Sequence, residues 1–230
     1  MTTTNFIRIF LFSLFTLTCH FSTFTQAQDA NTVYDWQLKK DKSGIQIFTS
    51  KVENSKYKAI RAVTEINTDM HNAIALILDL TACSEWVHLC VESKLIESVS
   101  KTESYIYTYT NAPFPIKNRD MVSHVMWQFD HNTGKVSMLS KATEGRVPQS
   151  KRAIRITNAT AQWHFTTIDQ TTLRVECYVH IDPAGPVPAW LSNLLLIKSP
   201  FKTIQNMRQI LESGRYQSAT PPFTLPFNNS

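Results

Sequence analysis

The sequence predicts an α+β domain in which a curved antiparallel β-sheet wraps around one long C-terminal α-helix. Two observations lead to this prediction. Most of the chain between 90 and 182 consists of strand-like segments, rich in β-branched and aromatic residues and separated by turns. One long amphipathic segment follows, over 187–214. Because the meander and the helix must each bury an apolar face, the economical arrangement is a sheet that curls around the helix.

The first part of the domain predicts two strands and a helix. The segment YDWQLKKDKSGIQIFTSKV begins with a short polar helix or turn and continues as a strand, in which Ile45 and Ile47 alternate with Gln46. A second strand follows in YKAIRAVTEI. Asp69 stands where an N-cap would be, and a helix over 69–86 carries an apolar stripe at Ala73, Ile74, Ile77 and Leu78.

The middle of the chain predicts an antiparallel meander. The turn DHNTGK is a hairpin connection between two of its strands. The predicted strand segments are 90–100, 103–112, 120–130, 135–144, 153–168 and 172–182.

The last element, over 187–214, is predicted to be a helix with a broad apolar face. We expect Pro200 to kink it and Gly214 to end it. The tail over 217–230 is rich in proline and is expected to be flexible. The apolar face of the helix comprises Trp190, Leu194, Ile197, Phe201, Ile204 and Leu211.

The N-terminus reads as a secretory signal peptide over residues 1–27. Arg8 precedes a run of Phe, Leu and Ile, and small residues follow up to Ala27, where we expect cleavage. The alternative is an uncleaved membrane anchor, which the short and interrupted apolar run disfavours. We therefore expect a periplasmic or secreted protein that begins near Gln28.

Charge and cysteine content exclude several classes of protein. Without Arg8, 22 of the 23 basic residues remain against 18 acidic ones, a mature net charge of +4. The basic residues do not interleave with aromatic ones along a helix, so nucleic-acid binding is not expected. Cysteine and histidine spacing fits no zinc site, and we expect no metal. Of the mature cysteines, Cys83 and Cys90 can pair if a helix ends between them, and an odd number leaves at least one unpaired.

The stretch PFPIKNRDMV, over 113–122, is the most specific motif. Pro113 and Pro115 restrict the backbone at the corner between two strands, and Arg119 and Asp120 can pair or hydrogen-bond the neighbouring backbone. We expect these four residues to be architectural.

This stretch resembles the hallmark turn of START domains, the StAR-related lipid-transfer family. Four further segments match in order: DWQLKKDKSGIQIF, SEW, AIRITNATAQW and DPAGPVPAWLSNLL. The resemblance covers nearly all of the mature chain and is assigned to a domain over 32–216. It suggests an exported bacterial member, related to the Bet v 1-like superfamily.

The resemblance implies a helix-grip fold with an internal apolar cavity that holds a fatty acyl or sterol-like ligand. It implies no cofactor, a monomer and transient contact with a membrane surface. Residues that phosphatidylcholine-binding members use for the headgroup correspond here to Cys83, Thr108 and Met121, so we expect that lipid to be disfavoured. The expected cavity residues are Ile106, Thr108, Met121, Ser123, Val125, Ala159 and Ala161 on the sheet and Trp190, Leu194, Ile197 and Phe201 on the last helix.

Two alternatives stay open. A helix-grip enzyme of the cyclase or aromatase type would need an acid or base inside the cavity. Strand alternation places His124 and His164 on the outer face, and we expect no enzymatic activity. The other alternative is a solid-cored interaction module without a ligand, which the presence of a cavity would argue against.

A closed cavity needs an entrance. The polar loop over 143–153, together with the start of the last helix near Trp190 and Leu194, is the predicted gate. The corner over 113–119 is the alternative route.

Overall fold

The computed structural model describes residues 34–188, 191–192 and 194–223. The predicted signal peptide, Trp190 and the last seven residues of the tail therefore lie outside the described residues. The strands are β1 (Gln37–Lys42), β2 (Ile45–Ser50), β3 (Ala59–Asn67), β4 (Cys90–Ser98), β5 (Glu103–Thr110), β6 (Asn118–Asp130), β7 (Lys135–Thr143), β8 (Ala153–Ile156), β9 (Asn158–Thr167) and β10 (Thr172–Asp182). The helical elements are α1 (Met70–Leu78), η1 (Leu80–Ala82), α2 (Cys83–Trp86), η2 (Leu194–Lys198) and α4 (Ser199–Glu212).

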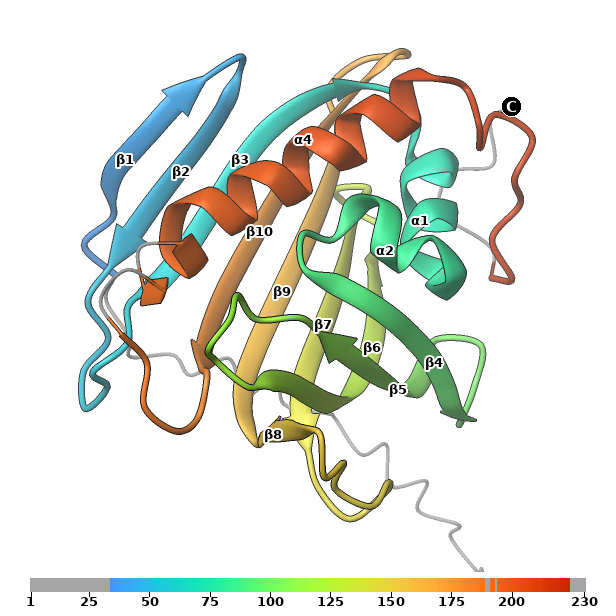
Figure 1. Ribbon diagram of the computed structural model, residues 1–230. Helices are drawn as coiled ribbons and strands as arrows, with labels where there is room; N and C mark the ends of the chain where they lie inside the picture. The colour runs from blue at the N-terminus through green and yellow to red at the C-terminus, as the bar shows by residue number, and fades with distance from the viewer. Residues whose placement is uncertain (1–33, 189–190, 193, 224–230) are drawn as a thin grey trace, which may run out of the picture. The chain divides into compact units, whose positions relative to one another are not determined.

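The sheet is a curved, ten-stranded structure with α4 lying across its concave face (Figure 1). The strand order is β1-β2-β3-β10-β9-β7-β6-β5-β4, and β8 pairs with the start of β6 in parallel. Pairing of β3 with β10 joins the N-terminal strands to the last strand of the meander. The predicted α+β fold, with a curved antiparallel sheet around a C-terminal helix, is confirmed. Among the described residues, no helix is long and apolar enough to cross a membrane.

The first strand was not expected. The sequence suggested a short helix or turn before Ile45, but Gln37–Lys42 forms β1 and pairs with β2. Lys42 lies opposite Ile45, so the hairpin has a two-residue loop of Ser43 and Gly44, both with positive φ. That backbone conformation matches the twist of a tight hairpin. Because β1 is an exposed edge strand with polar side chains on both faces, it lacks the apolar alternation that would have revealed it.

The helix predicted over 69–86 begins as expected but is broken. The Asp69 side chain caps α1 by accepting a hydrogen bond from the Asn72 amide at 2.8 Å. At Asp79 a new helical turn begins, because the Asp79 side chain accepts hydrogen bonds from the amides of Thr81 and Ala82. The segment therefore divides into α1, η1 and α2, and the last piece ends before Cys90.

The core contains a large aromatic cluster at one end of the concave face. Trp127, Trp163 and Phe165 pack against one another, with ring centroids 6.4 Å apart for Trp127–Phe165 and 6.3 Å for Trp163–Phe165. The tail contributes Phe223, whose ring centroid lies 5.6 Å from that of Trp127. The described part of the tail, up to residue 223, is thus packed against the sheet rather than loose.

Candidate functional site: an apolar cavity beneath the last helix

A cavity of about 460 Å³ lies between the sheet and the beginning of the last helical segment. Its wall is mainly aliphatic. The sheet contributes Ile60, Ala62, Thr108, Met121, Cys177, Val179 and Ile181, and the helical segment contributes Leu191, Leu195, Leu196, Ser199, Pro200, Thr203 and Ile204. Polar hydroxyl groups of Thr108, Ser199 and Thr203 interrupt this apolar surface.

The predicted sheet residues share one face, but only two of them line the cavity. Thr108 lies opposite Met121 in the pairing of β5 with β6, and both line the wall. The other predicted sheet residues do not line the cavity; they are Ile106, Ser123, Val125, Ala159 and Ala161. The wall is instead completed by β3 and β10, whose alternating apolar residues are the signal that would have found them.

The helix contributes a different face from the one that sequence periodicity indicated. Leu194–Lys198 forms a π-helical turn, in which each hydrogen bond spans five residues instead of four. This shifts the phase of the preceding residues relative to α4, so Leu191 and Leu195 line the cavity. Leu194, Ile197 and Phe201, predicted to line it, border an open groove on the other side of the helix.

That groove lies between β1 and the start of the helix and has a volume of about 910 Å³. Its polar rim consists of lysines from both elements, with the Lys40 ammonium 3.6 Å from the centroid of the Phe201 ring. The groove is lined by Lys40, Lys42, Pro113, Leu194, Ile197, Lys198, Phe201, Lys202 and Gln205.

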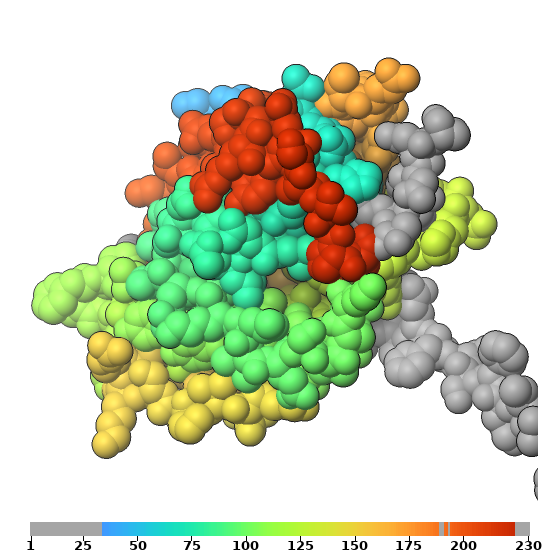
Figure 2. Space-filling model, turned by 90° about the vertical axis from the view of Figure 1, so that its right-hand side faces the viewer, coloured from blue at the N-terminus to red at the C-terminus, as the bar shows by residue number. Residues whose placement is uncertain are grey.

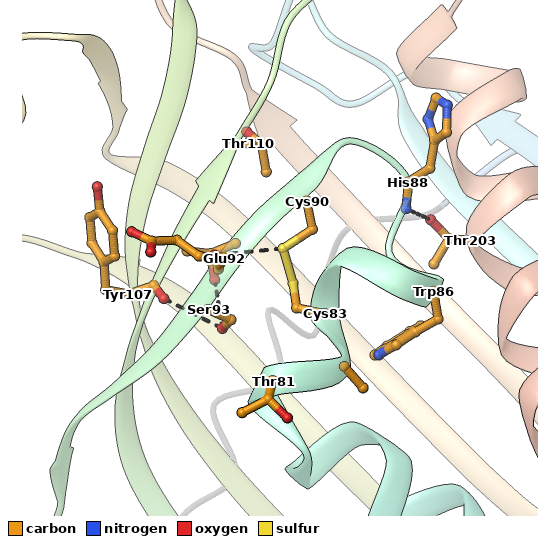
Figure 3. Close-up of a disulfide and its surroundings, with 12 residues drawn as sticks. Thr81, Cys83, Trp86, His88, Cys90, Glu92, Ser93, Tyr107, Thr110 and Thr203 are labelled. Carbon is orange, nitrogen blue, oxygen red and sulfur yellow. Dashed lines mark hydrogen bonds between the residues drawn. A yellow bond between two sulfur atoms is a disulfide. The ribbon is translucent and has the colours of Figure 1, made fainter. Parts of the chain in front are cut away.

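A short loop, 87–89, closes one side of the cavity and is held at both ends. The Cys83–Cys90 disulfide joins α2 to the start of β4, with the Cα atoms 5.9 Å apart (Figure 3). Within the loop, the His88 amide donates to the Thr203 hydroxyl at 3.0 Å, and His88 Nδ1 lies 3.1 Å from the Ser199 hydroxyl. Burial and the nearby lysines lower the pKa of His88, which favours the neutral ring. No sequence pattern pointed to His88.

Next to the 87–89 loop, helices α1 and α2 and the tail cover the sheet beside β4 (Figure 2). Figure 2 shows α1, α2 and the described part of the tail lying against this part of the sheet, with a small hollow between them and the strands. Tyr216 fastens the end of the chain to the α1–η1 junction, because its hydroxyl donates to the Asp79 carboxylate at 2.8 Å.

The corner over 113–122 has the architectural contacts expected of it. Arg119 donates from Nε to the Pro183 carbonyl and from Nη2 to the Ala184 carbonyl, both at 3.0 Å, and from Nη1 to the Lys117 carbonyl. These bonds tie the start of β6 to the loop that leads to the last helix. Pro113 borders the outer groove, and the Phe114–Pro115 bond is cis.

Asp120 pairs with a different arginine. Its carboxylate receives two hydrogen bonds from Arg155, each at 2.9 Å, and both side chains are almost fully buried. Burial alone would raise the pKa of Asp120, but the Arg155 guanidinium holds that pKa below its usual value. The buried pair therefore links β6 to β8.

The loop predicted as the gate does not border the cavity. None of the residues 143–153 lines the cavity. This loop instead packs on the outer face, where the Arg146 guanidinium lies 3.9 Å from the Tyr105 ring centroid and pairs with Glu97. The loops that border the cavity are 56–58, 87–89, 110–112 and the segment from Pro183, so the corner between β5 and β6 is the better candidate for an entrance.

The strand histidines lie on the outer face, as alternation indicated. His124 pairs with Glu103 at 2.7 Å, and His164 lies 2.8 Å from the Ser137 hydroxyl. Within the described residues, no cluster of histidine, cysteine and acidic side chains is arranged to hold a metal ion.

Comparison with known proteins agrees with this architecture. The chain is 32% identical over 178 residues to an uncharacterized protein of Pseudomonas aeruginosa, covering 77% of this chain and 87% of the relative. The solved structure of a STAR-related lipid transfer protein fragment from Xanthomonas axonopodis is 28% identical, with a TM-score of 0.70 over 77% of this chain and 98% of that chain. Human StAR-related lipid transfer protein 5 shares the fold, with a TM-score of 0.70 at 15% identity over 82% of this chain and 91% of that chain.

The family model of the START domain matches residues 25–215, which include every described strand and the whole of α4. That range holds both the curved sheet and the cavity beneath the helix. The chain therefore belongs to the START domain family.

Proposed function

We propose that the protein binds a hydrophobic small molecule, of the fatty acyl or sterol-like kind, in this cavity and carries it between membranes. The observation that supports the proposal most is the cavity itself. Its volume of about 460 Å³ lies within the range of roughly 300–1,000 Å³ that is typical of small-molecule sites. A solid-cored interaction module would fill this space with side chains.

The wall is suited to binding by burial of apolar surface. Each methylene group that leaves water for such a wall contributes about 0.8 kcal/mol, before the cost of ordering the ligand. The Thr203 hydroxyl accepts from the His88 amide, which leaves its own O–H to donate to a ligand on the wall. We propose binding without catalysis, because His124 and His164 are engaged on the outer face and the cavity-lining His88 is engaged with Ser199.

Phosphatidylcholine fits this cavity poorly. Two acyl chains and a headgroup need more space than a single-chain or sterol-like molecule. Cys83 is engaged in a disulfide, and Thr108 and Met121 offer no aromatic ring to a quaternary ammonium group. We expect slow phosphatidylcholine transfer.

Membrane contact is proposed at the corner that borders the cavity. Phe114 is 95% exposed on the loop between β5 and β6, whose neighbours Asn111 and Ala112 line the cavity. The lysines of the outer groove lie on the adjoining surface, where each contributes about 1 kcal/mol of attraction to an anionic bilayer.

Export of the protein is also part of the proposal. The Cys83–Cys90 disulfide fits an oxidising compartment such as the periplasm or the extracellular space. It is consistent with the predicted signal peptide. N-terminal sequencing of the exported protein should begin between Ala27 and Ala30, whereas a full-length membrane-embedded product would contradict it.

Ligand binding is tested by displacement. Fluorescent fatty-acid and sterol analogues should bind the purified protein and compete for one site. Val179→Trp places a large ring on the cavity wall and should abolish binding, while Val99→Trp, at an exposed position just after β4, should not. Failure of every lipid class to bind the folded wild-type protein would overturn the proposal.

A further inference from the structure

The charges on the cavity wall are unbalanced. Among the described residues that line the cavity, the side chains with a full charge are Lys56, Lys58, Arg119 and Asp120. Asp120 is the one carboxylate, and Arg155 already neutralises it through two hydrogen bonds of 2.9 Å. The wall therefore carries three positive charges without a free negative one.

Of the three cationic side chains, Arg119 is the buried one. The residue is 6% exposed, and its three hydrogen bonds all go to neutral backbone carbonyls, those of Lys117, Pro183 and Ala184. A guanidinium has five N–H donors, so these bonds leave two without a partner among the residues that the structure describes. Burial lowers the pKa of Arg119, and the group that acts in the opposite sense is the Tyr57 phenol rather than a carboxylate.

A buried cation without a counter-ion is costly, even when carbonyl oxygens accept its hydrogen bonds. The chain retains this cation at the end of an apolar cavity. In the pairing of β6 with β5, Arg119 lies opposite Thr110 and two residues from Met121, on the same face as the cavity wall. A ligand whose anionic end reaches this position would supply the missing negative charge.

We propose that the cavity selects amphiphiles with one apolar body and an acidic head group, a carboxylate or phosphate that pairs with Arg119. Lys56 and Lys58, exposed on the loop between β2 and β3, attract the same head group to the entrance. This inference rests on the proposed lipid binding and specifies the chemical class of the ligand. It adds a specificity role to a residue whose carbonyl contacts alone would make it a structural brace.

The wild-type protein provides the first test. Displacement of a neutral fluorescent sterol analogue is measured at pH 8 with four molecules that share a C16 chain: hexadecanoate, hexadecyl phosphate, hexadecanol and hexadecyltrimethylammonium. The better anion should bind roughly tenfold to one hundredfold more tightly than hexadecanol, the range that a charge-assisted hydrogen bond contributes. The cation should bind most weakly. Comparison of hexadecanoate with hexadecyl phosphate identifies the preferred acidic group.

Variants then assign the preference to Arg119. Arg119→Gln should remove the advantage of the anions over hexadecanol, measured as the ratio of their affinities in the same variant, and Arg119→Lys should restore part of that ratio. Arg152→Gln, at an exposed arginine outside the cavity wall, is the matched control and should change nothing. If Arg119→Gln does not fold, the head-group series is compared between the wild type and Lys56→Gln/Lys58→Gln. An anion preference that persists without the two lysines supports Arg119 as its source, and one that disappears with them contradicts it.

The outcomes separate this inference from the proposed function. Equal binding of hexadecanol and both anions by the wild type would overturn the acidic-head inference and leave lipid binding intact. An anion preference that survives in folded Arg119→Gln would overturn the assignment to Arg119. Failure of all four molecules and of the sterol analogue to bind would overturn the proposed function itself.

Discussion

Two regions of the concave face of the sheet differ in the volume of the side chains that their strands place there. At one end, Trp127, Trp163 and Phe165 fill the space between the sheet, α1 and the tail. At the other end, the same face carries Ala62 and Val179, and the cavity lies there. The strands of both regions contribute mainly apolar side chains to this face, so the size of those side chains decides which end is solid and which end is hollow.

The largest expected effect comes from emptying the solid end. Phe165 is fully buried, and Phe165→Ala should lower the free energy of unfolding by about 3 to 5 kcal/mol, since it removes apolar contacts and leaves a void. Ile181→Ala on the cavity wall removes a side chain that already borders empty space, and should lower it by less than about 2 kcal/mol. Urea unfolding of both variants measures the difference, and equal losses would contradict the distinction between the two regions.

The corner between β5 and β6, at the hollow end, depends on an ion pair. Asp120→Asn leaves Arg155 buried without its carboxylate and should lower the free energy of unfolding at pH 7 by about 3 kcal/mol or more. Because the pKa of Asp120 is lower in the folded protein than in the unfolded chain, its stabilisation is complete above pH ~4 and is lost as the pH falls through the folded value. Unfolding at several pH values should therefore show the wild type and Asp120→Asn converging in acid. A difference that is independent of pH would contradict this account.

The disulfide should have the next largest effect. Cys83→Ser/Cys90→Ser frees the loop that closes the cavity and should lower the free energy of unfolding by about 2 to 3 kcal/mol. Because His88 in that loop contacts Ser199 and Thr203, ligand release should also become faster. Stopped-flow release of a fluorescent lipid checks this, and unchanged release in a folded variant would show that the 87–89 loop does not limit ligand exit.

The smallest effect on stability is expected at the exposed corner. Phe114 is 95% exposed, and Phe114→Ser should change the free energy of unfolding by less than about 0.5 kcal/mol. It should nevertheless weaken co-sedimentation with vesicles that contain anionic lipid. The matched substitution Leu95→Ser, on the exposed β4 edge, should leave vesicle binding unchanged.

The sequence predicted the fold and the sheet face, because strand alternation and a long amphipathic helix leave a clear pattern. It missed β1, whose pairing depends on a two-residue turn rather than on apolar alternation. It also assigned Leu194 and Ile197 to the cavity, because periodicity cannot anticipate a π-helical turn that shifts the phase of the helix.

The remaining site features depend on long-range pairing. Cys177 and Val179 line the cavity because β10 pairs with β3, and no local pattern indicates that pairing. The different roles of Arg119 and Arg155 also could not be predicted from the sequence. Asp120 follows Arg119 in the chain but pairs with Arg155, and this leaves Arg119 without a carboxylate.

The central claim is that the hollow end of the concave face holds a lipid. Native mass spectrometry of protein purified from its own host, followed by organic extraction, tests it most directly. We expect a single-chain or sterol-like molecule bound one to one in the wild type and in Val99→Trp, and none in folded Val179→Trp. Wild-type protein without any bound lipid, or Val179→Trp with as much lipid as the wild type, would contradict the account.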